Sequence, residues 1–375
     1  MKRKSTLKNQ NGFTMLEVLV AMTLGLVVLG SAIGMQVSHR KSFKVTESKL
    51  NMQTNARFAF EFIGSSLREL GTIGCRTVEN YADGYRIAFV DKNIAFADFN
   101  LGKEIEGYDN VEGNTQWSPV VPPAFDFTGN MTDGSDAITI RGAVGEVYPV
   151  DMDDNEGLSS AGIGIQLNMA NISNIQLAPL QYAVLSQCAF AEVFQITGTQ
   201  AQVNAGTIEH GISGLAVSNQ NTTFTSDFDT RSIAELRRVA VTSYYIANND
   251  NGIPTLYRDR DNTSNPLVEG VERMQIEYGV NTDKSTAWSG GTVNVPDEYH
   301  DAVGVAASAA GWANVVAVRL SFIMRSKEEV YEQDVTKTYS LPGTTVYSYT
   351  PTDKYARLIY TATVNLRNRT LGKRT

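Results

Sequence analysis

Residues 11–38 read NGFTMLEVLVAMTLGLVVLGSAIGMQVS, and this stretch decides how the rest of the chain is organised. From Val18 to Ser38 it holds 21 residues without a charge. At 1.5 Å per residue these residues form a helix about 31 Å long, close to the thickness of the hydrocarbon core of a bilayer. The first twelve residues carry four basic side chains and no acid, and a far larger domain follows the apolar run. The positive-inside rule therefore predicts a cytoplasmic amino terminus and a head on the other side of the membrane.

The start of the apolar run differs from an ordinary secretory signal, which has its small-residue cleavage site after the run. Here Gly12 stands directly before the apolar Phe13, and a lone carboxylate, Glu17, lies at the start of the membrane segment. A charged side chain costs about 2.5 to 3.5 kcal/mol at the bilayer centre on insertion scales, and less near the interface. We therefore expect Glu17 to have a partner.

The pattern G-F-T-x-x-E after a short basic leader resembles the processing site of type IV pilins and secretion pseudopilins. The resemblance implies that Gly12 is the last leader residue and that a membrane peptidase cuts there and N-methylates Phe13. It also implies that Glu17 is the assembly glutamate. In physical terms, the new amine and the carboxylate of an adjacent subunit neutralise each other in a medium of low dielectric constant.

Past the membrane segment, apolar residues continue to recur every three to four positions. They are Ala56, Ala59, Phe60, Ile63, Leu67 and Leu70. The helix is therefore predicted to run from Phe13 to about Leu70, roughly 87 Å, with Gly71 and Gly74 as stop signals. Three glycines in the membrane half permit close helix packing or local melting, or reflect ordinary tolerance of glycine in membrane helices. They are Gly25, Gly30 and Gly34.

After residue 75 the helical period gives way to short β patterns. Strands are predicted near residues 136, 182, 189, 237, 271, 315 and 356. Long polar connections are predicted at 100–135, 145–175, 218–232 and 281–312. The expected fold class is α+β, with a long amino-terminal helix packed on an antiparallel β-sheet head that carries long loop insertions. The expected divisions are a leader (1–12), a membrane half of the helix (13–38), an amphipathic half (39–71) and the head (72–375).

The chain has two cysteines, Cys75 and Cys188. In an exported chain such a pair more often forms a disulfide than a metal site or a nucleophile. We predict a disulfide, and the alternative is two separate buried thiols in a reduced compartment.

Five segments of the chain resemble, in the same order, the pattern of PilW-type minor pilins. They are RFAFEFIGSSLRELGTIGC (57–75), SQCAFAEVFQIT (186–197), YYIANNDNGIPTLYRD (244–259), LVEGVERMQIEYGV (267–280) and NVVAVRLSFIMRS (314–326). The resemblance implies a subunit that primes assembly of a type IV pilus and lies in a tip complex with other minor pilins and a tip-associated adhesin. Further implied partners are the major pilin, the prepilin peptidase and the inner-membrane assembly platform. The chain would lie in the inner membrane with a periplasmic head, and then at the pilus tip, supporting motility, adhesion or DNA uptake.

The remaining features do not indicate an enzyme. The chain is acidic, with a formal charge of −8, so direct nucleic-acid binding is not expected. His39, His210 and His300 suggest no catalytic triad, and no zinc spacing, phosphate-binding loop or nucleophile elbow occurs. We predict no catalytic residue, no cofactor and no metal site.

Two smaller patterns have ordinary structural explanations. Asp151, Asp153 and Asn155 have the spacing of the opening of a calcium loop, but Glu156 stands where that loop needs glycine, and a solvated acidic loop explains them better. The tryptophans at 117, 288 and 312 fall in or near the long connections, and we expect them to pin loops onto the core rather than anchor a partner.

Two other functions fit parts of the sequence. A minor pseudopilin of a type II secretion system would share the processing site and Glu17. A membrane-anchored periplasmic enzyme or binding module would keep an uncut amino terminus.

Overall fold

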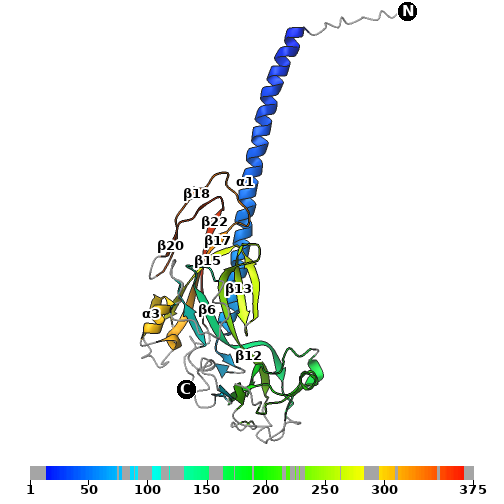
Figure 1. Cartoon of the computed structure of the whole chain (residues 1–375), viewed down its shortest axis with the longest axis vertical. Helices are drawn as coiled ribbons and strands as arrows, with labels where there is room; N and C mark the ends of the chain where they lie inside the picture. The colour runs from blue at the N-terminus through cyan, green and yellow to red at the C-terminus, as the bar shows by residue number, and fades with distance from the viewer. Residues whose placement is uncertain are drawn as a thin grey trace, which may run out of the picture.

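The computed structural model describes residues 14–73, 76–77, 85–87, 89–91, 104–110, 118, 131–151, 164–172, 174–187, 190–212, 217–219, 224, 228, 233–261, 263–282, 295–308, 311–343 and 347–366. All structural statements below concern these residues. The chain consists of one long helix and a β-rich head at the carboxyl end of that helix (Figure 1).

Helix α1 (Met15–Glu69) has 55 residues, a length of roughly 82 Å. Its last turn is closed by the backbone N–H of Leu70, which donates to the Leu67 carbonyl. Gly71 follows with a φ of 71°, the left-handed conformation in which glycine commonly ends helices. The predicted end of the helix at about Leu70 is therefore confirmed.

The head is built mainly of antiparallel strands, and the expected α+β class is confirmed. The strands are β1 (Thr72–Ile73), β2 (Arg76–Thr77), β3 (Tyr85–Ile87), β4 (Phe89–Asp91), β5 (Ile105–Tyr108), β6 (Ala137–Pro149), β7 (Ile165–Gln166), β8 (Tyr182–Ser186), β9 (Ala191–Gln195), β10 (Thr207–Ile208), β11 (Val217–Asn219), β12 (Glu235–Asn248), β13 (Pro254–Arg260), β14 (Thr263–Glu269), β15 (Val271–Val280), β16 (Glu298–His300), β17 (Val315–Arg325), β18 (Val335–Thr336), β19 (Tyr339–Leu341), β20 (Tyr347–Tyr349), β21 (Thr352–Asp353) and β22 (Arg357–Asn365). The short helices are α2 (Gln200–Asn204), α3 (Ala302–Ala307) and the 3-10 turns η4 (Met169–Asn171) and η5 (Trp312–Asn314). Each of the seven predicted strand segments forms a strand.

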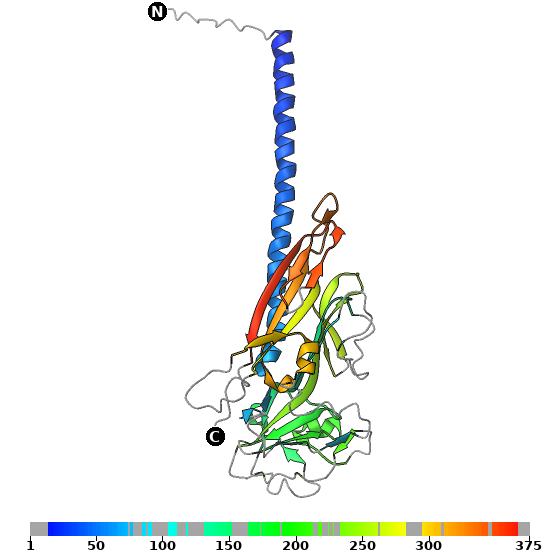
Figure 2. The same ribbon diagram turned by 90° about the vertical axis from the view of Figure 1, so that its left-hand side faces the viewer.

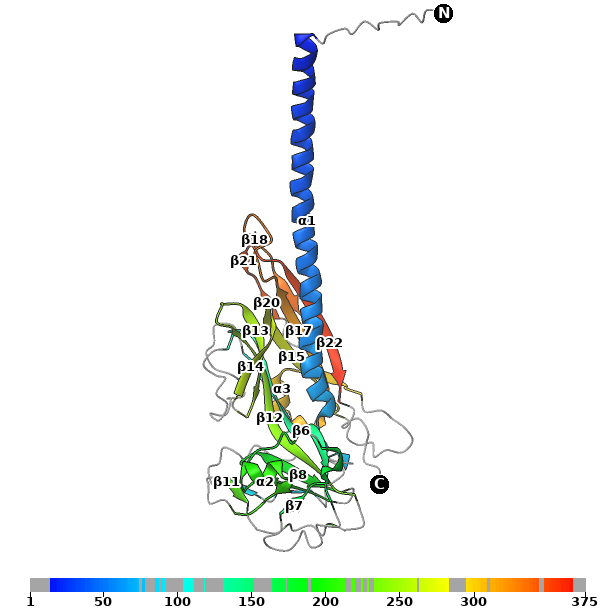
Figure 3. The ribbon, with the colours of Figure 1, turned by 90° about the vertical axis from the view of Figure 1, so that its right-hand side faces the viewer.

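The carboxyl-terminal half of α1, which is the lower half in the figures, packs against two sheets (Figures 2 and 3). One sheet has the order β16-β15-β17-β22, and the other contains β14, β13, β12 and β6. The helix contributes one buried stripe to the common core. Its members are Met52, Ala56, Ala59, Ile63, Leu67 and Leu70. The predicted apolar face is therefore confirmed, with Phe60 only partly buried at its margin.

Strands β6 and β12 are long enough to leave this body and enter a second lobe, farthest from the start of α1 (Figure 1). Along one edge, β12 pairs with β8 from Glu235 to Val239 and with β13 from Thr242 to Asn248. The opposite edge pairs with β6, whose register shifts opposite Arg237 and Arg238. Gly145 lies at this bulge with a φ of 75°, a conformation that side-chain-bearing residues rarely adopt. The distal lobe has its own apolar core, which includes Phe194, Phe224 and Leu236.

Three of the predicted long connections contain regular structure, which corrects the prediction. The stretch 100–135 contains buried strand β5, 145–175 contains the end of β6 and strand β7, and 281–312 contains β16 and α3. Polar composition did not reveal β5, β7 and β16 because these strands have only two to four residues, too few for an alternating pattern to stand out. The outer face of β17 is covered too, since Ile323 packs with Tyr339 and Leu341.

A buried ion cluster fastens the carboxyl-terminal strands to the body. Arg357 donates from Nε to Glu272 Oε2 at 2.5 Å and from Nη2 to Glu272 Oε1 at 2.8 Å. It also donates from Nη1 to Asp353 Oδ1 at 2.7 Å. The side chains of Arg357 and Glu272 are only 2% and 5% exposed. Such a pair is costly to break, because either partner left alone is a buried, uncompensated charge.

We therefore predict that Arg357→Ala lowers the free energy of unfolding by about 3 to 5 kcal/mol. Urea denaturation of the full chain in detergent, followed by near-ultraviolet circular dichroism, measures this change. Lys327→Ala is the matched control, because the Lys327–Glu269 pair is exposed and contributes about 0 to 1 kcal/mol. Equal losses in the two variants would contradict the structural role of the buried cluster.

A second buried cluster joins β5, β6, β15 and α3 through two carboxylates. Asp109 accepts hydrogen bonds from the backbone N–H groups of Ala302 (3.1 Å) and Val303 (2.9 Å). Asp136 accepts from the backbone N–H of Ile276 at 2.8 Å. Burial raises the pKa of Asp109 to about 6, against the lowering effect of its N–H donors. Burial and the charge of Asp109 together raise the pKa of Asp136 well above its ordinary value.

A raised carboxyl pKa means that the folded state holds its proton to higher pH than the unfolded state does. The stabilisation is complete below the unfolded pKa of about 4 and is lost as the pH rises through the folded pKa. We predict that Asp109→Asn removes the contribution of Asp109 to this dependence, so that the stability of the variant relative to the parent chain increases by about 2 kcal/mol between pH 4 and pH 7. Chemical denaturation at a series of pH values measures the difference. A constant difference across this range would show that Asp109 does not titrate with folding.

Candidate functional site

The first turn of α1 holds the predicted assembly glutamate in a defined position. Thr14 is the N-cap residue, and its Oγ1 accepts from the backbone N–H of Glu17 at 3.3 Å. In return, Glu17 Oε2 accepts from the backbone N–H and from the hydroxyl of Thr14, each at 3.1 Å. This reciprocal arrangement is a capping box, which satisfies helix N–H groups that would otherwise lack partners. The carboxylate also lies at the positive end of the helix dipole.

In the described part of the chain, α1 is exposed along its whole length from Met15 to Ser38. No part of its most apolar 18-residue window is buried within the chain, and its long apolar side chains, including Leu19, Val28 and Ile33, are exposed. An apolar surface of this extent needs lipid or another protein around it. A Cβ atom added at Gly25, Gly30 or Gly34 would meet no atom within 4 Å. Packing within this chain therefore does not require glycine at these positions.

Two ion pairs connect the helix to the head just below the apolar half. Lys41 Nζ lies 2.5 Å from Glu332 Oε1, and Lys44 Nζ lies 3.3 Å from Glu328 Oε2. Both acids belong to the segment between β17 and β18, which reaches up beside α1 (Figure 1). The side chains are largely exposed, so each pair contributes little to stability. Their effect is to orient the segment on the helix.

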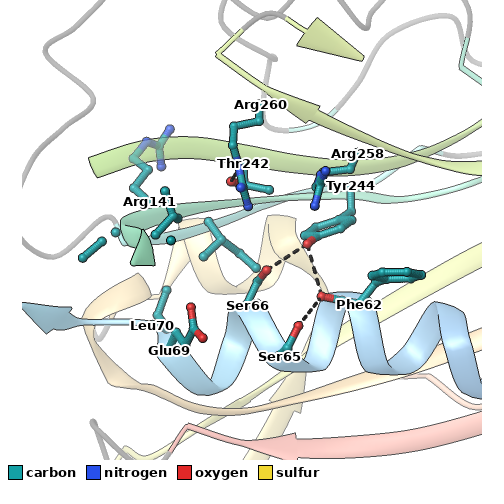
Figure 4. A pocket seen from close by; sticks show the side chains of 15 residues that line it. Phe62, Ser65, Ser66, Glu69, Leu70, Arg141, Thr242, Tyr244, Arg258 and Arg260 are labelled. Atoms are coloured by element: carbon teal, nitrogen blue, oxygen red, sulfur yellow. Dashed lines mark hydrogen bonds between the residues drawn. The ribbon is translucent and has the colours of Figure 1, made fainter. Parts of the chain in front are cut away.

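Hydrogen bonds fix the lower half of α1 on the sheet. The Tyr244 hydroxyl donates to the Phe62 carbonyl at 3.1 Å and lies 2.8 Å from Ser66 Oγ (Figure 4). Farther up, Asn55 Nδ2 donates to the Glu269 carbonyl at 3.0 Å. Together with the buried stripe, these bonds set the rotation of the helix relative to the head.

A cavity of about 140 Å³ lies beside Tyr244, between the last turns of α1 and strands β6, β12 and β13 (Figure 4). Arg258 and Arg260 contribute to its lining, and Arg260 Nε donates to Thr242 Oγ1 at 3.1 Å. Burial, and then the charge of Arg258, lower the pKa of Arg260. This volume is below the roughly 300 Å³ at which pockets for drug-sized ligands begin. The cavity therefore belongs to the packing of helix on sheet.

Several predicted site residues lie outside the described residues. They are Gly12, Phe13, Cys75, Cys188, Asp153, Asn155, Trp117 and Trp288, together with the second helix stop, Gly74. The cleavage site, the methylated terminus and the disulfide therefore remain predictions. Glu17 is described and caps α1, as given above.

The described histidines lie on separate elements. His39 is exposed on α1. His210 lies in the distal lobe, where its ring centroid is 4.3 Å from that of Phe224. His300 lies on β16, and its Nε2 is 3.0 Å from Oε2 of Glu298. Within the described part, no group of three or more His, Cys, Asp or Glu side chains is arranged to hold a metal. Trp312 is buried and packs edge-on against Tyr278 at 4.8 Å, which confirms its predicted packing role.

Two features of α1 were not predicted from the sequence, namely the capping residue Thr14 and the ion pairs of Lys41 and Lys44 with the head. Thr14 could have been found, because Thr-x-x-Glu before an apolar run is the signature of a capping box. The pairing of Lys41 and Lys44 with acids almost 300 residues away has no local signal, because it depends on where the β17–β18 segment lies in the folded head.

Comparisons with known proteins give two family matches. Residues 7–33 match the prokaryotic N-terminal methylation motif, and residues 243–368, about a third of the chain, match type IV pilus-assembly protein W (PilW). No curated protein and no solved structure matches the chain. The predicted resemblance to a prepilin-type precursor and to PilW is confirmed over these two regions.

The two matches support a type IV pilus-associated minor pilin, a structural class rather than an enzymatic one. The methylation motif and the apolar helix together support membrane anchoring. The PilW match begins within β12 and ends just past β22. It therefore covers much of the body around α1, whereas strands β7 to β10 of the distal lobe lie outside it.

Proposed function

We propose that this chain, which carries the methylation motif of prepilin-type precursors and a PilW-type head, is a minor pilin that primes type IV pilus assembly. It occupies the tip complex together with other minor pilins, the major pilin and a tip-associated adhesin. The observation that carries this proposal is a single helix with two different halves. The amino-terminal half is apolar and exposed, and the carboxyl-terminal half is built into the core of the head. Such a helix can reside in lipid before assembly and among other helices afterwards.

The precursor is held in the inner membrane with its head in the periplasm. Prepilin peptidase cuts after Gly12 and methylates Phe13, and the inner-membrane platform adds the mature subunit to the filament. Cys75 and Cys188 form a disulfide in the oxidising periplasm. The subunit supports the motility, adhesion or DNA uptake that the pilus serves.

The geometry at Glu17 suits a link between subunits. Both hydrogen bonds from Thr14 end on Oε2 of Glu17. A carboxylate offers about four acceptor positions on its two oxygens, so Oε1 can accept from the new amine of an adjacent subunit. In a helix-packed core of low dielectric constant, this pairing offsets the cost of burying either charge.

The first test is the mass of the mature chain. Mass spectrometry of the amino-terminal peptide from purified membranes and from sheared pili should show a chain that begins with methylated Phe13. An intact Met1 in both fractions would refute processing at Gly12 and would favour a membrane-anchored binding module with an uncut terminus.

The second test separates the charge of Glu17 from its role in capping. Glu17→Gln keeps a side chain that can complete the capping box, whereas Glu17→Ala removes both functions. We predict that both variants insert and are cut normally and that both lose incorporation into pili, because the neutral amide cannot pair with the cationic amine. Immunoblots of sheared pili measure incorporation. Normal incorporation of Glu17→Gln would show that only the capping geometry matters.

A minor pseudopilin of a type II secretion system is the second candidate function. It shares the processing site and Glu17, but the match to type IV pilus-assembly protein W over residues 243–368 favours the pilus. Purified surface pili without this chain, combined with failed protein secretion in its absence, would reverse the choice.

A further inference from the structure

The two large sheets of the body end in the edge strands β14 and β22, and only β14 has features that protect a sheet edge from pairing. Strand β14 contains Pro266, and its pairing with β13 shifts register between Leu256 and Tyr257. Both features are common ways of protecting a sheet edge from pairing with another chain. Strand β22, at the edge of the sheet β16-β15-β17-β22, pairs with β17 over nine residues in an unbroken register. Strand β22 has neither a proline nor a register shift in its pairing.

Hydrogen bonds at the two ends of β22 show which of its backbone groups face outward. Ser326 N–H donates to the Ala356 carbonyl at 2.9 Å, and Leu366 N–H donates to the Val316 carbonyl at 2.8 Å. In an antiparallel pair, hydrogen-bonded and non-hydrogen-bonded positions alternate. The even-numbered residues of β22 therefore bond to β17. The N–H and C=O groups of Ile359, Thr361 and Thr363 point away from the sheet.

The composition of this edge favours strand pairing. From Leu358 to Asn365 the sequence LIYTATVN has no charge, proline or glycine, and it is rich in residues with high β propensity. The side chains of Ile359, Thr361 and Thr363 are exposed. Long, regular and uncharged edges of this kind are templates for an additional strand.

The edge is also held rigidly by its inner face. The Tyr360 ring packs edge-on against Phe60 of α1, with 6.3 Å between ring centroids. A Cβ atom added at Gly64 would lie 3.5 Å from Cγ2 of Val364, so the helix and the strand approach closely. An incoming strand would therefore meet backbone groups that are already ordered, which lowers the entropic cost of binding.

The position of β22 indicates which partner it meets. The strand runs alongside the lower half of α1, at the flank of the head (Figures 2 and 3). The proposed function joins subunits through α1, which brings the heads of neighbouring subunits side by side. We propose that the outer edge of β22, which pairs with no strand among the described residues, binds an extended, uncharged strand from the head of a neighbouring pilus subunit. The proposal rests on the proposed function and extends it by naming the docking edge.

The test removes one outward N–H group while leaving the β17 ladder intact. Thr363→Pro deletes the N–H at an outward position, and Thr363→Ala is the matched control that keeps it. Full-length variants replace the parent chain in piliated cells. We expect Thr363→Pro to reduce the amount of the chain in sheared pili about tenfold, and we expect Thr363→Ala to leave it unchanged. Equal incorporation of the two variants would overturn the proposal.

A second measurement keeps the test independent of folding defects in the proline variant. A photo-crosslinking amino acid placed at Thr363 of the otherwise unchanged full-length chain should form an adduct with another pilus subunit, because residues on paired strands lie about 5 Å apart. Placed at exposed Ile212 in the distal lobe, it serves as the site control. Adducts only with a second copy of this chain, only with a non-pilin protein, or equally from both sites would overturn the proposal.

These outcomes are distinct from failure of the proposed function. If the parent chain is methylated at Phe13 and present in pili, but Thr363→Pro behaves like Thr363→Ala, the minor-pilin function stands and the docking edge is refuted. If the parent chain is never found in pili, the function itself fails.

Discussion

The structure depends on one constraint, which is that a single continuous helix must satisfy two different environments. For its first half, α1 is apolar and lies clear of the head, whereas its second half places a narrow stripe of small and medium side chains between two sheets. Ala56 and Ala59 are fully buried, so the helix backbone approaches the sheets closely. The helix is therefore part of the head core rather than a tether attached to it. Because the head folds around α1, the position of the apolar half of the helix is linked directly to the surfaces proposed to meet other subunits.

The head shows how this constraint is met. Hydrogen bonds from Tyr244 and Asn55 and the ion pairs of Lys41 and Lys44 fix the helix along its length. Arg357 and its two acids fasten the final strands, which close the core beside the helix. The distal lobe is different, because it reaches the body through the extended strands β6 and β12 and has its own core. The match to type IV pilus-assembly protein W falls on the body, including the helix-facing strands. Strands β7 to β10 of the distal lobe lie outside that match.

The two surfaces proposed for assembly follow from this arrangement. At the amino-terminal end, the capping box holds Glu17 with one oxygen occupied by Thr14, so an intersubunit contact can form without dismantling the helix start. At the flank, β22 is ordered by α1 on one face and by β17 along one edge, which leaves its other edge for a neighbour. Both surfaces are backed by the same helix. The proposed contacts between helices and between heads therefore both involve α1.

The sequence by itself determined the elements whose signals are local. The uncharged run from Val18 to Ser38 and the three-to-four-residue spacing up to Leu70 are local patterns of hydrophobic residues. Thr14 and Glu17 also carried a local capping signal. Only the tertiary structure decided which distant segments meet: the carboxylates Asp109 and Asp136, the strand β5 within a polar stretch, and the edge position of β22. These features arise from contacts between separate segments of the folded chain, and such contacts leave no periodic trace in the sequence.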